Sequence, residues 1–368
     1  MKFLAWLLVY ESRGLRGAFP GLKTRIWDTI LRGEYILLKN MKHRNFTQFW
    51  IMLLAACGIS WSASAQQEVF YSQYMFNTMA INPAYAGSRD VLSITALGRY
   101  QWIGVNGAPK THSLTLDMPF QNEKMGIGLT AYNDNIGRWN TTGVNLAYAY
   151  KFKLTERTTM SLGVQPTVTN VSANLFNVKN IDENDPAFNM DVSRFVFNAG
   201  LGMFISNDKA YFGLSVPQLI EQRISPNPDS EGKTQRHYFA MMGFVVGKGN
   251  FKLKPSTVIR VTKGAPVGLD GNLNLWYRDK IAIGFSARKS QMVFSGTDQM
   301  DALVGMLELQ LTPQLRIGFA YDTSLGKFNE NSEGQTFYKK IAGTPTYEGF
   351  LRYEFGFGKD KIVTPRYF

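Results

Sequence analysis

Few residues in this chain could take part in catalysis, and they are scattered. His112 and His237 are the two histidines that lie beyond a predicted leader. A lipid hydrolase would need a histidine near a serine and an orienting polar group. Ser113 follows His112 directly, but on a strand neighbouring side chains point to opposite faces. A serine from elsewhere in the fold could still serve, yet a non-catalytic strand histidine is the favoured interpretation, and we expect no enzyme.

The candidates for a cofactor or metal site are also weak. The acidic run Asp182-Glu183-Asn184-Asp185 could bind calcium weakly, but it lacks the EF-hand order and fits a solvated loop better. Cys57 is the single cysteine, so neither a disulfide nor a cysteine-based metal site can form within one chain. Gly126-Ile127-Gly128 could indicate a phosphate loop, but no helical pattern follows. These glycines fit small, lumen-facing positions on a strand, and we expect no cofactor.

The composition favours a strand-rich fold and excludes several classes of protein. The chain has 26 Phe, 17 Tyr, 7 Trp and 34 Gly, and only 18% of its residues are charged, which is too apolar for a disordered chain. Half of the formal net charge of +12 lies in residues 1–65, and the remaining basic residues are dispersed. We therefore expect no nucleic-acid partner.

Residues 41–65 have the order of a secretory signal peptide. A basic start, Met41-Lys42-His43-Arg44, precedes the apolar run 49–56, and Ala63-Ser64-Ala65 offers a cleavage site before Gln66. The apolar run is too short to span a bilayer. Residues 1–40 are then an upstream extension of doubtful biological meaning, with a cytoplasmic extension as the alternative. Leu54-Ala55-Ala56-Cys57 also resembles a lipoprotein processing box, in which Cys57 would carry the lipid.

Beyond Asp90 the chain consists of segments in which apolar and small or polar residues alternate. Leu92, Ile94, Ala96, Gly98 and Tyr100 share one face of such a segment, and Ser93, Thr95 and Arg99 share the other. About fourteen segments follow this rule, and they start near residues 91, 109, 125, 141, 158, 195, 209, 236, 250, 267, 280, 302, 314 and 346. This pattern predicts an all-β fold over 91–368, a transmembrane antiparallel β-barrel of the outer membrane. Pro166 and Pro255 interrupt two of the segments, which are the weakest strand predictions.

The connections between segments alternate in length, which supports the barrel and orients it. Short polar turns follow the even segments, at 121–124, 154–157, 207–208, 247–249, 278–279 and 312–313. Longer connections mostly follow the odd segments, notably 170–194, 217–235, 289–301 and 323–345. Since such barrels have short periplasmic turns and long external loops, the short turns and both chain ends should face the periplasm. A soluble β-sandwich shares the strand alternation but does not require strictly alternating connections.

Residues 66–90 do not alternate like a strand. Asn82-Pro83 favours a turn, and Ala86-Gly87-Ser88 favours a second bend before the first strand. The aromatic and methionine side chains of this segment need burial. We expect it either to enter the barrel mouth as a partial plug or to lie against the periplasmic rim.

Two runs within this segment are distinctive: Tyr71-Ser72-Gln73-Tyr74-Met75-Phe76-Asn77 and Ile81-Asn82-Pro83-Ala84-Tyr85-Ala86-Gly87. Chiefly through these runs, the chain resembles the PorP/SprF family of type IX secretion system proteins of Bacteroidota. Arg99-Tyr100-Gln101-Trp102, Thr111-His112-Ser113 and 347–353 fit the family further, and the resemblance spans 66–368.

The resemblance implies an outer-membrane protein that supports export or surface attachment of a cognate secreted adhesin and in some members gliding. Its implied partners are outer-membrane lipid, that adhesin and periplasmic components of the secretion or motility machinery. A small-solute diffusion channel is the alternative function. The candidate partner segment comprises Tyr71, Ser72, Gln73, Tyr74, Met75, Phe76, Asn77, Asn82, Pro83, Ala84, Tyr85, Ala86 and Gly87.

Overall fold

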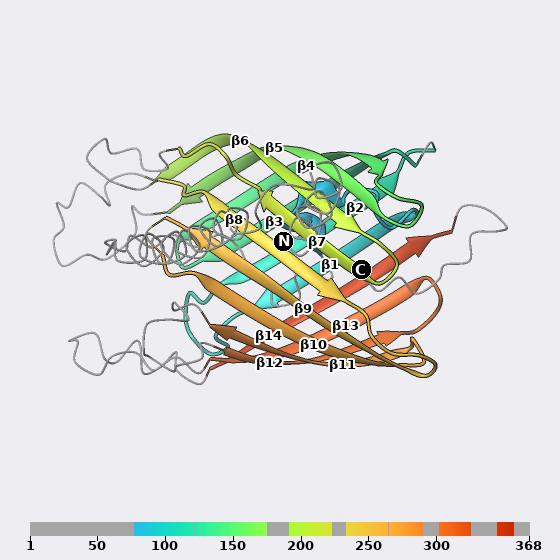
Figure 1. Ribbon diagram of the computed structural model, residues 1–368. Coiled ribbons are helices and arrows are strands. Elements are labelled where there is room, and N and C mark those ends of the chain that lie inside the picture. The colour runs from blue at the N-terminus through green and yellow to red at the C-terminus, as the bar shows by residue number, and fades with distance from the viewer. Residues whose placement is uncertain are drawn as a thin grey trace, which may run out of the picture. The chain divides into compact units, whose positions relative to one another are not determined.

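Fourteen antiparallel strands close into a barrel in the part of the chain that the structure describes. The structure is a computed structural model, and it describes residues 77–121, 123–174, 191–222, 233–263, 265–289, 302–324 and 344–356. Each strand pairs with its neighbours in sequence, and β1 pairs with β14 from Leu92↔Phe355 to Tyr100↔Tyr347. Figure 1 shows the tilted strands from the side. Closure leaves no sheet edge, which is what a sheet inside a lipid bilayer requires.

The strand positions confirm the sequence prediction, since every predicted start lies within three residues of an observed one. The strands are β1 Leu92–Tyr100, β2 Lys110–Pro119, β3 Met125–Ile136, β4 Trp139–Lys153, β5 Thr159–Ala173, β6 Val192–Ser206, β7 Ala210–Val216, β8 His237–Phe244, β9 Phe251–Thr262, β10 Gly268–Tyr277, β11 Ile281–Lys289, β12 Ala302–Gln310, β13 Leu315–Ser324 and β14 Pro345–Phe355. Two 3-10 turns precede them, η2 Thr78–Ala80 and η3 Pro83–Tyr85. Among the described residues, no helix is long and apolar enough to cross a membrane.

The two faces of the wall differ as the alternation predicts. In β1 the buried side chains are Ser93, Thr95, Leu97 and Arg99, and in β10 they include Asp270, Asn272, Asn274 and Trp276. The large apolar side chains exposed on the other face of β10 are Leu273, Leu275 and Tyr277. The barrel therefore presents apolar side chains outward and a largely polar wall inward, which is the arrangement for a lipid environment.

Aromatic side chains lie on the outer face near both ends of the strands. At the short-turn end, Phe251 and Tyr277 lie on β9 and β10 with ring centroids 5.0 Å apart. At the other end, Tyr321 and Tyr347 lie on β13 and β14 with centroids 5.6 Å apart. Such belts are typical of side chains at the two interfaces of a membrane, where a ring can have one apolar and one wet side.

Pro166 and Pro255, the two prolines that weakened the strand predictions, lie within strands, and each coincides with a gap in one ladder. Pro166 is in β5, where the β4–β5 pairing skips from Asn145↔Thr167 to Tyr148↔Val164, while the β5–β6 ladder continues through it. Pro255 is in β9, where the β8–β9 ladder ends at Gly243↔Ser256 before one further bridge. A proline lacks only one N–H, so a single ladder is interrupted and the strand itself continues.

The six predicted short turns all join the strands as expected, at one end of the barrel. The predicted long connection 170–194 is shorter than expected, because β5 extends to Ala173 and β6 begins at Val192. Strands β4, β5 and β6, of 15 residues each, are longer than the 7 residues of β7 or the 9 of β1. Their pairing supports the extra length, since β4–β5 runs to Trp139↔Ala173 and β5–β6 to Ala173↔Val192.

An arginine at the centre of the outer face should destabilise the barrel far more than one at its end. We expect Leu273→Arg in β10 to cost about 2–4 kcal/mol of unfolding free energy and Tyr277→Arg, at the end of the same face, about 0–1 kcal/mol. Denaturant unfolding from lipid vesicles measures both. Equal losses for the two variants would contradict the placement of Leu273 in the bilayer.

Candidate functional site in the barrel interior

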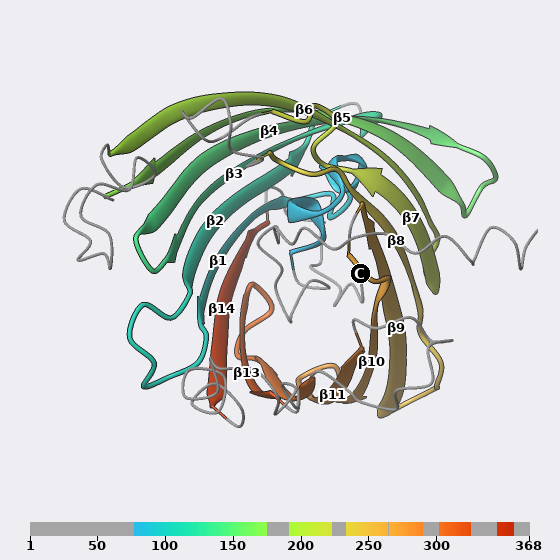
Figure 2. The same ribbon diagram turned by 90° about the vertical axis from the view of Figure 1, so that its left-hand side faces the viewer.

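Residues 77–90, here called the inner segment, lie against the inner side of the wall. Figure 2 shows η2 and η3 (blue) inside the ring of strands. Met79, Ile81, Ala84, Tyr85 and Ala86 form one hydrophobic cluster with inward side chains that include Phe204 and Met241. The rings of Tyr85 and Phe204 meet edge to face, with centroids 5.4 Å apart. This burial gives the segment an apolar attachment to the strands, as non-strand backbone inside a barrel requires.

Asn82 fixes the middle of the inner segment. Its side-chain oxygen accepts from the Ala84 backbone N–H at 3.0 Å and so caps η3, whose first residue is Pro83. Its side-chain nitrogen donates to the carbonyls of Met203 at 3.0 Å and Leu214 at 3.4 Å, which are opposite each other in the β6–β7 ladder. Ser215 adds a hydrogen bond from its hydroxyl to the Ile81 carbonyl, 2.6 Å. One fully buried amide therefore joins a turn of the segment to two strands.

Glycines on the inner wall leave the space that the segment occupies. A Cβ built on Gly163 would lie 2.3 Å from the Ala84 nitrogen, and one on Gly126 would lie 2.2 Å from the Ala86 oxygen. A Cβ on Gly202 would lie 2.1 Å from the Asn82 side-chain oxygen. Since these contacts are shorter than atoms tolerate, β3, β5 and β6 accept the segment only because glycine stands there. This finding confirms the prediction that Gly126 and Gly128 are inward-facing strand residues, and it explains why glycine is needed on this part of the wall.

The end of the inner segment is held by charged groups. The Gly87 N–H donates to the Asp117 carboxylate at 2.5 Å, and Lys151 donates to the Gly87 carbonyl. Gly87 has φ +70°, a conformation that favours glycine. Arg89 then pairs with Glu354 of β14 at 2.8 Å. The segment is thus tied on one side to β2 and β4 and on the other to the strand that closes the barrel.

The candidate partner segment is only partly within the described residues. Tyr71, Ser72, Gln73, Tyr74, Met75 and Phe76 lie outside them. The remaining residues are all buried against the wall: Asn77, Asn82, Pro83, Ala84, Tyr85, Ala86 and Gly87. A partner could therefore touch these residues only if the segment left its seat. In the structure their contacts are intramolecular.

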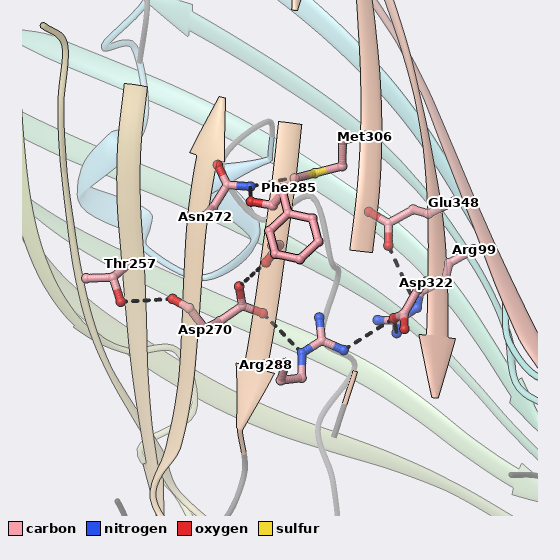
Figure 3. A network of polar contacts seen from close by, with 10 residues as sticks. Arg99, Thr257, Asp270, Asn272, Phe285, Arg288, Met306, Asp322 and Glu348 are labelled. Carbon is pink, nitrogen blue, oxygen red and sulfur yellow. Dashed lines mark hydrogen bonds and ion pairs between the residues drawn. The ribbon is translucent and has the colours of Figure 1, made fainter. Parts of the chain in front are cut away.

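A second polar arrangement crosses the opposite part of the interior (Figure 3). Asp270 of β10 accepts hydrogen bonds from Ser286 at 2.7 Å and from Arg288 at 3.0 Å. Arg288 also approaches Asp322 at 3.5 Å, and Arg99 approaches the same carboxylate at 3.5 Å.

Arg99 extends this network to Glu348 at 3.7 Å. Side chains of β10, β11, β13, β14 and β1 are joined, across the β1–β14 seam. In a buried setting the loss of one partner costs far more than the intact pair gains, so removal of one member should destabilise the barrel more than the intact network stabilises it.

The other residues with chemical potential do not converge on a site. His112 points outward, where its ring meets Tyr100 at 5.3 Å, and Ser113 points inward, as the strand prediction requires. His237 is buried, and its Nδ1 lies 3.1 Å from the Gln235 carbonyl. No group of three potential metal ligands occurs among the described residues, and 182–185 lies outside them.

Gly163→Ala should dislodge the inner segment while leaving the barrel closed, because its methyl group would meet the backbone of Pro83 and Ala84. Arg89 is buried in the wild type and should resist trypsin. In the variant, cleavage after Arg89 should rise by about an order of magnitude, detectable by mass spectrometry, if the seat is weakened by roughly 1–3 kcal/mol of overpacking. Gly305→Ala is the matched control, because a Cβ there meets nothing within 4 Å. Equal protection in both variants would contradict the seat.

Comparison with solved structures finds barrels with low sequence identity. The monoaromatic hydrocarbon channel CymD matches with 9% identity over 76% of this chain and 93% of its own, at a TM-score of 0.48. A TodX channel mutant has 8% identity, covers 76% and 94%, and has a TM-score of 0.45. A FadL homologue of Pseudomonas aeruginosa has 12% identity, covers 75% and 93%, and has a TM-score of 0.38. None of these three likenesses is close enough to support a functional argument, and a search of curated proteins found no match.

A family model covers most of the chain. The model described as type IX secretion system membrane protein PorP/SprF matches residues 63–337, which include the inner segment and thirteen of the strands. Together with a closed barrel that is apolar outside and polar inside, this match places the protein in the outer membrane. The chain belongs to the PorP/SprF family of type IX secretion system membrane proteins.

Proposed function

We propose that this barrel supports the export of a cognate secreted adhesin, or its attachment to the cell surface, and contributes to gliding motility. Family membership carries the link to type IX secretion. The occupied interior supports a partner-binding role: the inner segment lies on one part of the inner wall and buried ion pairs cross another. A barrel filled in this way is suited to present surfaces to other proteins.

In this proposal the two ends of the barrel have different partners. The short-turn end faces the periplasmic components of the machinery, and the end with the longer connections faces the client. The direction rests on the usual difference between periplasmic turns and external loops. The predicted signal peptide, residues 41–65, would deliver the chain to the periplasm.

A small-solute channel is the second candidate, because the inner wall is polar. Asn272, Asn274 and Ser286 are among the uncharged inward residues, and such a lining suits an aqueous passage. The inner segment decides between the two functions, since a barrel that it plugs would not conduct. We propose that residues 77–90 act as this plug.

Deletion of the protein should remove a specific adhesin from the cell surface. Surface proteolysis followed by mass spectrometry of intact cells would measure it, with the complemented strain as control. We expect the loss of one or a few surface proteins, with their accumulation inside the cell or in the medium. An unchanged set of surface proteins together with unchanged gliding would refute the export role.

Planar bilayers test the plug and the channel alternative together. The wild-type barrel should show little stable conductance, whereas Gly163→Ala should show frequent openings because its methyl group displaces the segment. Gly305→Ala should behave like the wild type. Stable open conductance of the wild type would favour the diffusion channel.

A further inference from the structure

Two arginines face each other inside the barrel near its short-turn end. Arg316 of β13 and Arg352 of β14 are direct partners in the antiparallel ladder, and both side chains are buried. Like charges at opposed positions of a sheet repel each other. Arg316 donates from Nε to Gln310 at 2.6 Å and lies over the indole of Trp276 at 4.8 Å. Arg352 donates from Nε to Thr95 at 3.0 Å. These hydrogen-bond and ring partners are neutral, so they do not themselves offset the repulsion between the two guanidinium groups.

Two further cations interact electrostatically with this pair. Lys254 of β9 interacts with both arginines, and so does Arg89 of the inner segment. Glu308 interacts electrostatically with all four cations, and Glu354 interacts with the three arginines. Glu354 is already paired with Arg89 at 2.8 Å.

The nearby Lys151 brings two further carboxylates into the count. It lies 3.7 Å from Asp90, and Asp117 interacts with Lys151, Arg89 and Arg352. Among the described residues, these five cations therefore stand against four carboxylates, Asp90, Asp117, Glu308 and Glu354.

Glu308, Trp276 and Tyr85, which are buried in the same region, have polar atoms without a hydrogen-bond partner in the described part of the chain. These atoms are both carboxylate oxygens of Glu308, the indole nitrogen of Trp276 and the hydroxyl of Tyr85. Glu308 is 1% exposed and interacts electrostatically with all four cations. Tyr85 interacts with Arg89, Arg316 and Arg352. Buried polar atoms are nearly always hydrogen-bonded, so this grouping indicates a bound polar species.

We propose that Arg316, Arg352, Lys254 and Glu308 form a binding site for inorganic phosphate. The two guanidinium groups and the ammonium group would donate to the bare phosphate oxygens, in the charge-assisted bonds that arginine and lysine form with phosphate. Monohydrogen phosphate also carries an O–H, which would donate to Glu308. Sulfate has no such hydrogen at neutral pH, so Glu308 would repel it. The carboxylate thus selects phosphate, and the cations supply the affinity.

Calorimetry on the purified full-length barrel in detergent tests the site. The wild type should bind inorganic phosphate about tenfold or more tightly than sulfate, a margin that one unpaired buried charge can supply. Glu308→Gln should bind the two anions with similar affinity, because an amide can donate to either. Arg316→Gln and Lys254→Gln should each weaken phosphate binding about tenfold or more. Lys248→Gln, in the exposed turn between β8 and β9, is the charge-matched control and should leave phosphate binding unchanged.

Two further measurements keep the test decisive. The heat-dependent gel shift of folded barrels shows whether each variant has folded, and either cation variant suffices if the other fails. Trp276 lies beside Arg316, so phosphate should change its fluorescence, and Trp276→Phe should abolish that change while calorimetric binding persists. The proposal is overturned if the wild type binds no phosphate at about 10 mM, well above a specific affinity. It is equally overturned if folded Arg316→Gln and Lys254→Gln bind phosphate like the wild type, or if Glu308→Gln keeps the preference over sulfate.

Discussion

The pairing of β1 with β14 is the constraint on which the rest of the structure depends. A strand in hydrocarbon cannot leave its N–H and C=O groups unbonded, so the first and last strands must meet. Once they pair, side chains alternate strictly between lipid and interior, and every inward residue shares one enclosed space. The seat of the inner segment, the ion pairs around Asp322 and the arginines of β13 and β14 exist because closure brings them together. Pro166 and Pro255 are tolerated within this closed sheet because each interrupts a single ladder.

The enclosed space is divided between two kinds of contact. Towards β2–β8 the wall offers mainly glycines and apolar side chains that fit the inner segment by shape, with Asp117 and Lys151 as charged contacts at its end. Towards β9–β14 and β1 the wall carries charges, and these form either ion pairs or the cationic group near Arg316. Arg89 connects the two regions, because it belongs to the segment and pairs with Glu354 of β14. A movement of the segment would therefore also change the charge balance on the other side, a coupling that needs no large rearrangement of the strands.

Much of the fold could be predicted from the sequence, because the decisive signals are local. Alternation over about ten residues and short polar turns fix the strands, and these depend only on neighbours in the chain. The aromatic and methionine content of the segment 66–90 predicts its burial, but it does not predict which part of the inner wall residues 77–90 contact. Asn82 bonds to Met203 and Leu214, more than a hundred residues away, and Gly163 is an ordinary strand glycine in sequence. The opposition of Arg316 and Arg352 likewise depends on the exact register between two strands separated by a long connection.

The burial of the candidate partner segment changes how the role of its residues should be understood. The candidate partner residues that the structure describes, Asn77 and 82–87, are buried in the barrel interior. A buried amide with strand carbonyls as partners, such as that of Asn82, costs about 1–3 kcal/mol to leave unsatisfied, and this holds the segment in place. A partner that displaced the segment would have to replace those bonds. These residues then serve the architecture of the barrel itself, and the proposed contact with a client would involve surfaces that the folded barrel presents.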